Sequence, residues 1–154
     1  MRMSEIVEIK IKRLSAEFDD IPIPRYATSG SAGLDVRAAI EKEIIIEPSG
    51  IELVPTNLSV EIPVGYEIQV RPRSGLAANH GIGILNSPGT IDSDYRGEIK
   101  IIMINLGKKK FTIKRGDRIA QLVVSKVYTA NLIQSDDLNH SQRGKGGFGH
   151  TGKE

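Results

Sequence analysis

A chain of 154 residues, with 39% hydrophobic and 26% charged residues, has the size and composition of a single globular domain with its own core. It contains no cysteine, which excludes disulfides, thiol nucleophiles and thiolate metal sites. The net charge of +2 is too small to indicate a nucleic-acid partner and no apolar run can span a bilayer, so we expect neither nucleic acid nor membrane as a partner.

Alternating apolar and polar residues predict strands from the start of the chain. The N-terminus has no signal-peptide core, which predicts a cytoplasmic protein, and it leads into Val7, Ile9 and Ile11 alternating with charged residues. The same alternation over residues 58–62 and 66–71 predicts further strands with one buried face.

Two apolar runs, at residues 44–46 and 99–106, predict strands that are buried on both faces. Proline and glycine punctuate the intervals between the runs, as expected for turns. Many short strands at this spacing predict an antiparallel sandwich, jelly roll or barrel.

One short helix is predicted, with Ser74 as its N-cap and Gly81 ending it in a left-handed conformation. Arg71 and Arg73 precede it, and two arginines beside a helix N-terminus favour binding of an anion. A simple cap with surface arginines explains the same residues, so the spacing leaves both interpretations open.

Residues 86–98 predict a hairpin, because Pro88-Gly89 suits a turn and leaves backbone groups free to bond a flat ligand. Asp92 and Asp94 are either ordinary turn residues or carboxylates that position a water beside a phosphate, and their spacing does not decide between these roles. The basic run at residues 108–110 predicts a solvated hairpin turn.

The chain from Ser141 onward is rich in glycine, and by itself we expect it to be mobile. Residues 147–154 approach the P-loop pattern, but they lack its final hydroxyl residue and the helix that must follow, which excludes a P-loop NTPase. Glycines beside Arg143 and Lys145 suit phosphate binding, and a disordered terminus is the alternative. The three histidines lack ligand spacing, and neither a zinc-deaminase pattern nor a serine-hydrolase elbow occurs.

Five segments, in order, together resemble the motifs of the dUTPase family. They are residues 31–39, 71–77, 89–98, 115–122 and 143–149. The resemblance implies an all-β, distorted jelly-roll or β-barrel fold with one short helix, assembled as a homotrimer with shared active sites. It also implies that residues 1–140 form the β domain and that residues 141–154 form a lid over a neighbouring subunit's site.

The resemblance further implies a dUTP diphosphatase that lowers dUTP and supplies dUMP for thymidylate synthesis. Asp92 would be the general base that activates water for in-line attack on the α-phosphorus, since a carboxylate is ionised at working pH. Mg²⁺ would be the cofactor, with Asp35 and Gln121 contacting it through water. The phosphates would be held by Arg73, Ser74 and Gly75.

Recognition of dUTP is implied by the same resemblance. The uracil would pair with Asn86 and with backbone groups of Thr90, Ile91 and Lys100, and Tyr95 would pack under the deoxyribose. Other substrate-binding residues would be Gln121, Arg143 at the γ-phosphate, Phe148 stacked on the base, and Gly149. His150 stands where the family often has serine, and Thr151 remains as a hydroxyl donor.

Two other functions are compatible with this scaffold. A dCTP deaminase needs a glutamate base in the pocket and does not need the tail at residues 143–149. A nucleotide-sensing module binds dUTP without an intact base or lid. Asp92, Tyr95 and the tail favour the hydrolase over both.

Overall fold

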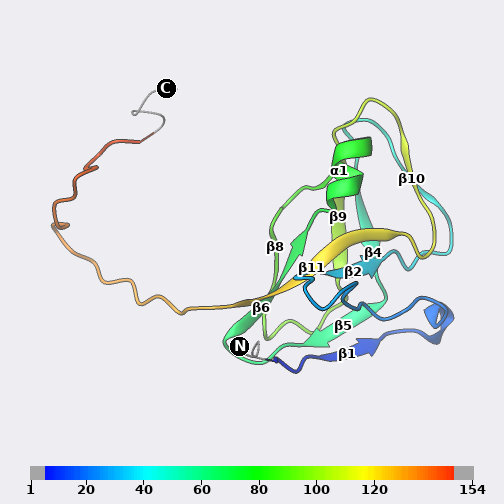
Figure 1. The fold of residues 1–154 in the computed structure, drawn as a ribbon, viewed down its shortest axis with the longest axis horizontal. Helices are drawn as coiled ribbons and strands as arrows, with labels where there is room; N and C mark the ends of the chain where they lie inside the picture. Colours follow the sequence, from blue (N-terminus) through cyan, green and yellow to red (C-terminus); the bar gives the residue numbers. More distant parts are fainter. Residues whose placement is uncertain (1–5, 148–154) are drawn as a thin grey trace.

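Short β-strands make up most of the regular structure (Figure 1). The computed structural model describes residues 6–147, and α1 (Ser74–His80) is the only α-helix in that part of the chain; η1 (Ala16–Phe18) is a 3-10 turn. The strands are β1 (Lys10–Arg13), β2 (Leu34–Arg37), β3 (Ile44–Ile46), β4 (Ile51–Pro55), β5 (Leu58–Glu61), β6 (Tyr66–Arg71), β7 (Ile82–Ile84), β8 (Gly89–Ile91), β9 (Lys100–Asn105), β10 (Phe111–Ile113) and β11 (Arg118–Lys126). The predicted all-β fold with one short helix is confirmed.

Most strands pair with partners that are distant in the sequence. The sheets have the orders β2-β11-β6-β8, β4-β9-β7, β1-β5 and β10-β3, and each of these pairings is antiparallel. Consecutive strands such as β8 and β9 therefore lie in different sheets, and the chain crosses repeatedly between layers, as in a jelly roll.

The inward faces of the sheets meet in one apolar core. Its largest fully buried side chains include Ile46, Ile82, Ile99, Ile101, Met103, Ile113 and Ile119. Branched aliphatic residues of this kind pack well on pleated strands. The predicted burial of Leu58, Val60 and Ile62 is confirmed.

The predicted burial of two runs on both faces is wrong. In β3, Ile45 is 46% exposed, and after β9, Leu106 is 73% exposed. In β9 alternate residues face the core, while Ile102 and Ile104 point to the other side beside Leu53 and Ile51 of β4. These four side chains form an open surface, which we call the apolar sheet face.

The first strand also differs from its prediction. β1 begins at Lys10, so Val7 and Ile9 precede it, and Ile11 is exposed rather than buried. The physical reason is that β1 is an edge strand that pairs with β5 alone.

Ser74 is not the N-cap of α1. It is the first helical residue, and Arg73, in an extended conformation, occupies the cap position without a side-chain cap hydrogen bond. At the other end Gly81 adopts φ 70°, which confirms the predicted left-handed stop.

Residues 86–98 do not form the predicted hairpin. β8 pairs with β6, whereas β9, the next strand, pairs with β4 and β7. The segment is a crossing between two sheets, because each flanking strand finds its partner elsewhere. The basic run at residues 108–110 is exposed, as predicted, but it too joins strands of different sheets.

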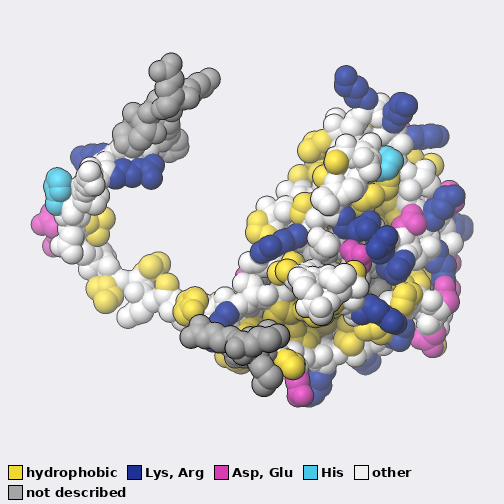
Figure 2. Space-filling view, viewed as in Figure 1, with side chains coloured by type: hydrophobic (Ala, Val, Ile, Leu, Met, Phe, Trp, Pro, Cys, Tyr) yellow, Lys and Arg dark blue, Asp and Glu magenta, His cyan; other side chains and the backbone are white. Residues whose placement is uncertain are grey.

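The chain beyond β11 extends away from the body as an arm, residues 127–147 (Figures 1 and 2). Val127 is tied to Gly65 by a backbone hydrogen bond of 2.8 Å, and the arm beyond it has no strand or helix. Tyr128, Leu132, Ile133 and Leu138 in the arm are each more than 80% exposed. No helix within residues 6–147 has the length and apolar character needed to cross a membrane.

Candidate functional site

A carboxylate held by two arginines lies where β2, β11 and the start of α1 come together. Asp35 Oδ1 accepts a hydrogen bond from Arg73 Nε at 3.1 Å, and Asp35 Oδ2 accepts one from Arg118 Nη1 at 3.0 Å. Gln121 pairs with Asp35 across the β2–β11 ladder. We call these four residues the charged cluster. Its arginines carry two positive charges against one carboxylate, which leaves the cluster suited to an additional anion.

The turn before β11 positions the cluster. Arg115 packs over the Phe18 ring and forms a bidentate ion pair with Asp20, at 2.6 and 3.1 Å. The hydrogen bond from Arg115 holds the pKa of Asp20 below its usual range. Arg37 Nη1 donates to the Gly116 carbonyl at 2.6 Å in the same turn. These bonds fix the turn against the N-terminal segment and so fix Arg118 at the start of β11.

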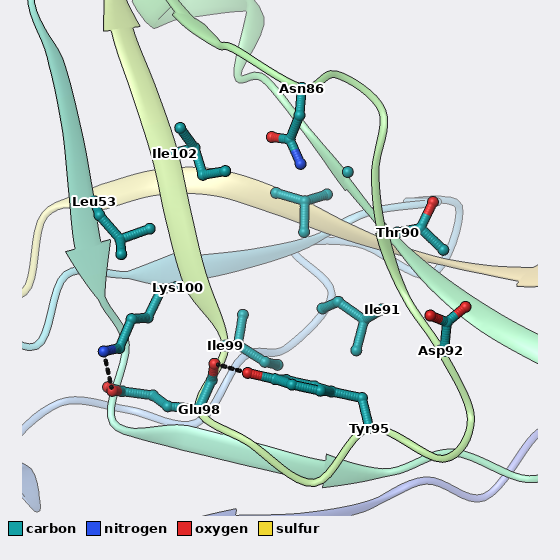
Figure 3. A pocket seen from close by; sticks show the side chains of 12 residues that line it. Leu53, Asn86, Thr90, Ile91, Asp92, Tyr95, Glu98, Ile99, Lys100 and Ile102 are labelled. Carbon is teal, nitrogen blue, oxygen red and sulfur yellow. Dashed lines mark hydrogen bonds and ion pairs between the residues drawn. The ribbon is translucent and has the colours of Figure 1, made fainter.

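A pocket of about 330 Å³ lies between β8 and β9 (Figure 3). It is lined by Leu53, Val70, Asn86, Gly89, Thr90, Ile91, Asp92, Tyr95, Glu98, Ile99, Lys100 and Ile102. We call it the base pocket, because the resemblance described above implies that uracil pairs with residues that line it. Its walls are mainly apolar, and polar side chains stand at its rim, as is common for sites that bind small organic ligands.

The base pocket offers unpaired backbone groups from two strands. β8 is the last strand of its sheet, so its second edge has no partner strand within residues 6–147. On β9, the Ile102 carbonyl accepts from Leu85 N at 2.9 Å, and the backbone of Lys100, two residues earlier, points to the same side. On this edge of β9, β7 pairs only with residues 103–105, so no strand within residues 6–147 pairs with Lys100 on this edge. A flat ligand between β8 and β9 therefore meets free N–H and C=O groups.

Buried polar side chains from the β4–β5 turn and from β5 support the pocket from behind. Thr56 Oγ1 donates to the Ile99 carbonyl at 2.6 Å, and Ser59 Oγ donates to the Arg96 carbonyl at 2.7 Å. Asn57 N donates to Glu98 Oε1 at 2.9 Å. Satisfied buried hydrogen bonds of this kind rigidify a structure, so the pocket wall is fixed without any ligand.

Asp92 and Tyr95 stand at the rim with different surroundings. The Asp92 side chain is exposed, and its carboxylate has no hydrogen-bond or ion-pair partner among the described residues. The Tyr95 ring lies along the pocket, and its hydroxyl donates to the Glu98 carbonyl at 2.9 Å (Figure 3). A free carboxylate beside an anchored ring leaves Asp92 available to bind a water.

The charged cluster and the base pocket are separated within one chain. Asp35 pairs with Gln121 and Gln121 with Arg71, whereas Ile91, next to Asp92, pairs with Ile68. Across the sheet, Ile91 therefore lies three strand spacings from Asp35, which is roughly 14 Å. Along the strand direction it is offset by three residues of β6, which is roughly 10 Å. The two carboxylates of one chain are too far apart to act on the same phosphate group.

The structure brings the predicted site residues into two groups. Asn86, Thr90, Ile91, Asp92, Tyr95 and Lys100 line the base pocket. Asp35, Arg73 and Gln121 form the charged cluster, with Ser74 and Gly75 following Arg73. Arg143 lies in the arm, where Nε donates to the Gly146 carbonyl at 2.8 Å. Phe148, Gly149, His150 and Thr151 lie outside the described residues.

Sequence reasoning gave no role to several residues that complete these groups. Arg118 lies within the motif-like segment at residues 115–122, three residues before Gln121. Only the folded chain shows that it pairs with Asp35. Thr56 and Ser59 likewise gave no signal in the sequence, and only the fold shows that they donate to the carbonyls of Ile99 and Arg96. The Glu98 side chain, in turn, accepts from the Asn57 backbone N–H. Gly33 lies within the first motif-like segment but was given no role, and the structure shows that a Cβ there would press against the Gln121 side chain at 3.2 Å.

Comparisons with known proteins agree on one family. Residues 19–152 match the family model described as dUTPase. The chain is 51% identical over 146 residues to the deoxyuridine 5'-triphosphate nucleotidohydrolase of Caldanaerobacter subterraneus subsp. tengcongensis, covering 95% of this chain and 98% of the relative. A mutant dUTPase of Staphylococcus bacteriophage 80alpha, solved with dUpNHpp, superposes with a TM-score of 0.83 at 25% identity and covers 94% of this chain and 98% of its own. A mutant dUTPase of phage phi11 of S. aureus, whose structure is described as revealing the coordination of a structural Mg(II) ion, superposes with a TM-score of 0.75 at 23% identity, covering 86% of this chain and 99% of its own.

Proposed function

The chain belongs to the dUTPase family, and from this premise we propose how its residues carry out the hydrolysis of dUTP to dUMP and pyrophosphate. The predicted family and enzyme class are confirmed: the chain is a dUTP diphosphatase. The observation that carries the proposed mechanism is the unpaired Asp92 carboxylate at the rim of the base pocket. We also propose a cytoplasmic location, where the product serves thymidylate synthesis.

Asp92 acts as the general base. Its carboxylate accepts a proton from a water, and the water oxygen attacks the α-phosphorus in line with the leaving pyrophosphate. The bond between the α-phosphorus and its bridging oxygen breaks, and dUMP and pyrophosphate result. The absence of an internal partner for Asp92 supports this role, because no hydrogen bond has to break before a water binds.

The base pocket binds uracil. Free backbone groups of β8 and of Lys100, with the Asn86 side chain, match the acceptor at O4 and the donor at N3. Cytosine has a donor in place of O4 and an acceptor in place of N3–H, so the buried partners of these groups would be left unpaired. Such a mismatch disfavours cytosine by a factor on the order of 10⁴. Thymine adds a methyl group that a narrow pocket excludes, and Tyr95 under the sugar excludes a 2′-hydroxyl.

The charged cluster and the start of α1 bind the phosphates. Arg73 and Arg118 are paired with Asp35 in the structure, so an incoming triphosphate competes with that carboxylate for the guanidinium groups. Ser74 and Gly75 offer backbone N–H groups at the first turn of the helix. Exchange of partners brings the phosphates onto the arginines and releases the Asp35 carboxylate.

The donor set fits Mg²⁺ held mainly by the substrate. Within residues 6–147 no group of three carboxylate or imidazole side chains is placed to hold a metal ion. Magnesium keeps several waters and is commonly bound by substrate phosphates with one or two carboxylates, which suits Asp35 and Gln121 as contacts to its water shell. Mg²⁺ held in this way would supply positive charge that offsets the negative charge of the triphosphate.

We propose a homotrimer with shared sites, as the family resemblance implies, and the separation of the two groups within one chain supports it. Asp92 of one subunit meets the charged cluster of another, and the residue 141–154 segment closes over a neighbouring site, carrying Arg143, Phe148 and Gly149. Two observations support self-association: the apolar sheet face of Ile51, Leu53, Ile102 and Ile104, and the exposed apolar residues of the arm. Apolar surfaces of this extent mark binding sites on soluble proteins.

Glu98 bears on the rival deaminase function. It lines the base pocket, where a deaminase needs a glutamate base. Its carboxylate is however occupied by the Asn57 backbone N–H at 2.9 Å and by Lys100 Nζ at 3.6 Å. Glu98 therefore acts as support for the pocket wall, and Asp92 remains the unpaired carboxylate. The same free base argues against a module that binds dUTP without hydrolysing it.

A pyrophosphate-release assay with dUTP, dTTP, dCTP and UTP, each with and without Mg²⁺, tests the proposal. We expect rapid release from dUTP in the presence of Mg²⁺ and release slower by on the order of 10³ or more from the other three. Equal rates from all four nucleotides would contradict the assigned base pocket. Deoxyuridine products from dCTP would instead establish the deaminase.

A further inference from the structure

Gly97 lies directly against the Tyr95 ring. A Cβ built on Gly97 would be 2.5 Å from Cζ and 2.8 Å from Cε2 of Tyr95, and closer still to its hydroxyl oxygen. These three ring atoms are the nearest heavy atoms to that position. The backbone of Gly97 has no positive φ. A side chain at this position would therefore meet the Tyr95 ring and displace it, whereas the backbone conformation does not itself demand glycine.

The ring is held in this place by a short local network. The Tyr95 hydroxyl donates to the Glu98 carbonyl at 2.9 Å, and the Glu98 side chain is tied to Asn57. Arg96 Nη1 bridges the carbonyls of Ser93 and Tyr95, at 2.7 and 3.0 Å. The loop therefore folds back under its own tyrosine, and the space that a side chain at position 97 would take is occupied by the ring.

We propose that Gly97 is a specificity-determining residue that positions the Tyr95 ring and so sets the preference for deoxyribose over ribose. The inference rests on the proposed role of Tyr95 under the sugar. Gly97 does not contact the substrate in this arrangement; it acts through the height and tilt of the ring. Any side chain at position 97 displaces the ring from the Glu98 carbonyl, and the surface that excludes a 2′-hydroxyl is lost.

A double-mutant cycle tests this coupling. Gly97→Ala, Tyr95→Ala and the double variant are compared with the unaltered protein by kcat/KM for dUTP and for UTP. We expect Gly97→Ala to lower the dUTP-to-UTP ratio of kcat/KM by at least about tenfold, since a displacement of about 1 Å has effects of this size. In the Tyr95→Ala background, where the clash is absent, Gly97→Ala changes the ratio by less than about twofold.

Gly30→Ala is the matched control, because a Cβ at Gly30 meets no atom within 4 Å and its backbone has no positive φ. It should leave the ratio unchanged. Thermal unfolding of each variant checks that the fold is retained. Gly97→Ser, which places a larger group in the same space, should lower the ratio at least as far as Gly97→Ala.

The outcomes separate the two levels of the proposal. If the unaltered protein releases no pyrophosphate from dUTP, the proposed function fails. If it does, but Tyr95→Ala keeps the sugar preference, the role of Tyr95 fails. If Tyr95→Ala lowers the preference and Gly97→Ala does not, or if Gly97→Ala has the same effect in both backgrounds, the inference about Gly97 is overturned.

Discussion

The base pocket and the charged cluster differ in how their structures are prepared for a ligand. The pocket is built from strand edges and mainly apolar side chains, and buried hydroxyls of Thr56 and Ser59 hold its wall in place. In the charged cluster, Asp35 and two arginines satisfy one another. The comparison indicates that the pocket has its shape before a ligand arrives, whereas the cluster has to exchange partners. Rigid, mainly apolar walls suit discrimination between bases, and exchangeable ion pairs suit a charged group that must later leave.

In the proposed mechanism Asp92 acts between these two regions, and its substitution should have the largest effect. Asp92→Asn removes the proton acceptor while keeping the shape of the side chain, so we expect turnover of dUTP to fall by at least about 10² with binding within several-fold. Steady-state kinetics and a direct binding titration give the two quantities. Asp94→Asn, which changes an exposed carboxylate outside the pocket lining, is the control. Unchanged turnover in Asp92→Asn would end the assignment.

Removing the tail should impair both regions at once. Deleting the residues after Gln142 takes away Arg143 from the phosphates and Phe148 from the base, so we expect turnover to fall at least about tenfold while the unfolding temperature stays the same. Activity and thermal unfolding are measured on the same preparation. Full activity in the shortened chain would show that the tail has no part in the site.

Mixing two inactive variants tests whether the regions that cooperate come from different subunits. Asp35→Asn impairs the charged cluster and Asp92→Asn impairs the base-pocket side. The two variants are unfolded and refolded together in equal amounts. We expect about one quarter of the activity of the unaltered protein, because random assembly combines an intact Asp35 with an intact Asp92 in about one quarter of the shared sites. Each variant refolded alone is the control. No recovery would place both carboxylates of a working site in one chain.

The smallest effect is expected from the buried support of the pocket. Thr56→Val keeps the volume of the side chain but leaves the Ile99 carbonyl unpaired, which should cost about 1–3 kcal/mol of unfolding free energy and raise KM for dUTP several-fold. The Mg²⁺ dependence should not change, since the charged cluster is untouched. Urea unfolding and kinetics provide the measurements. Ser125→Ala, at a half-buried hydroxyl outside both regions, should alter neither.

The sequence predicted some parts of the fold correctly and others not. The alternation at residues 58–62 and 66–71 correctly predicted strands and their buried faces, because the period of side chains along a strand is a local property. It failed at Ile45 and Leu106, where burial depends on whether a second layer covers that face. The prediction of a hairpin at residues 86–98 failed for a related reason: a proline–glycine turn is a local feature, but the choice of partner strand is not.

The sequence by itself determined the family, the enzymatic activity, the strand-rich fold with one helix, and the chemical types of the site residues, since ordered motifs and side-chain periodicity are carried by the chain directly. Only the tertiary structure decided that Asp35 lies between Arg73 and Arg118, that β8 and β9 present free edges to one pocket, and that Gly97 makes room for the Tyr95 ring. The physical reason is the range of the interactions. Strand pairing and ion pairs join residues up to about a hundred positions apart, and their geometry follows from the register and twist of whole sheets.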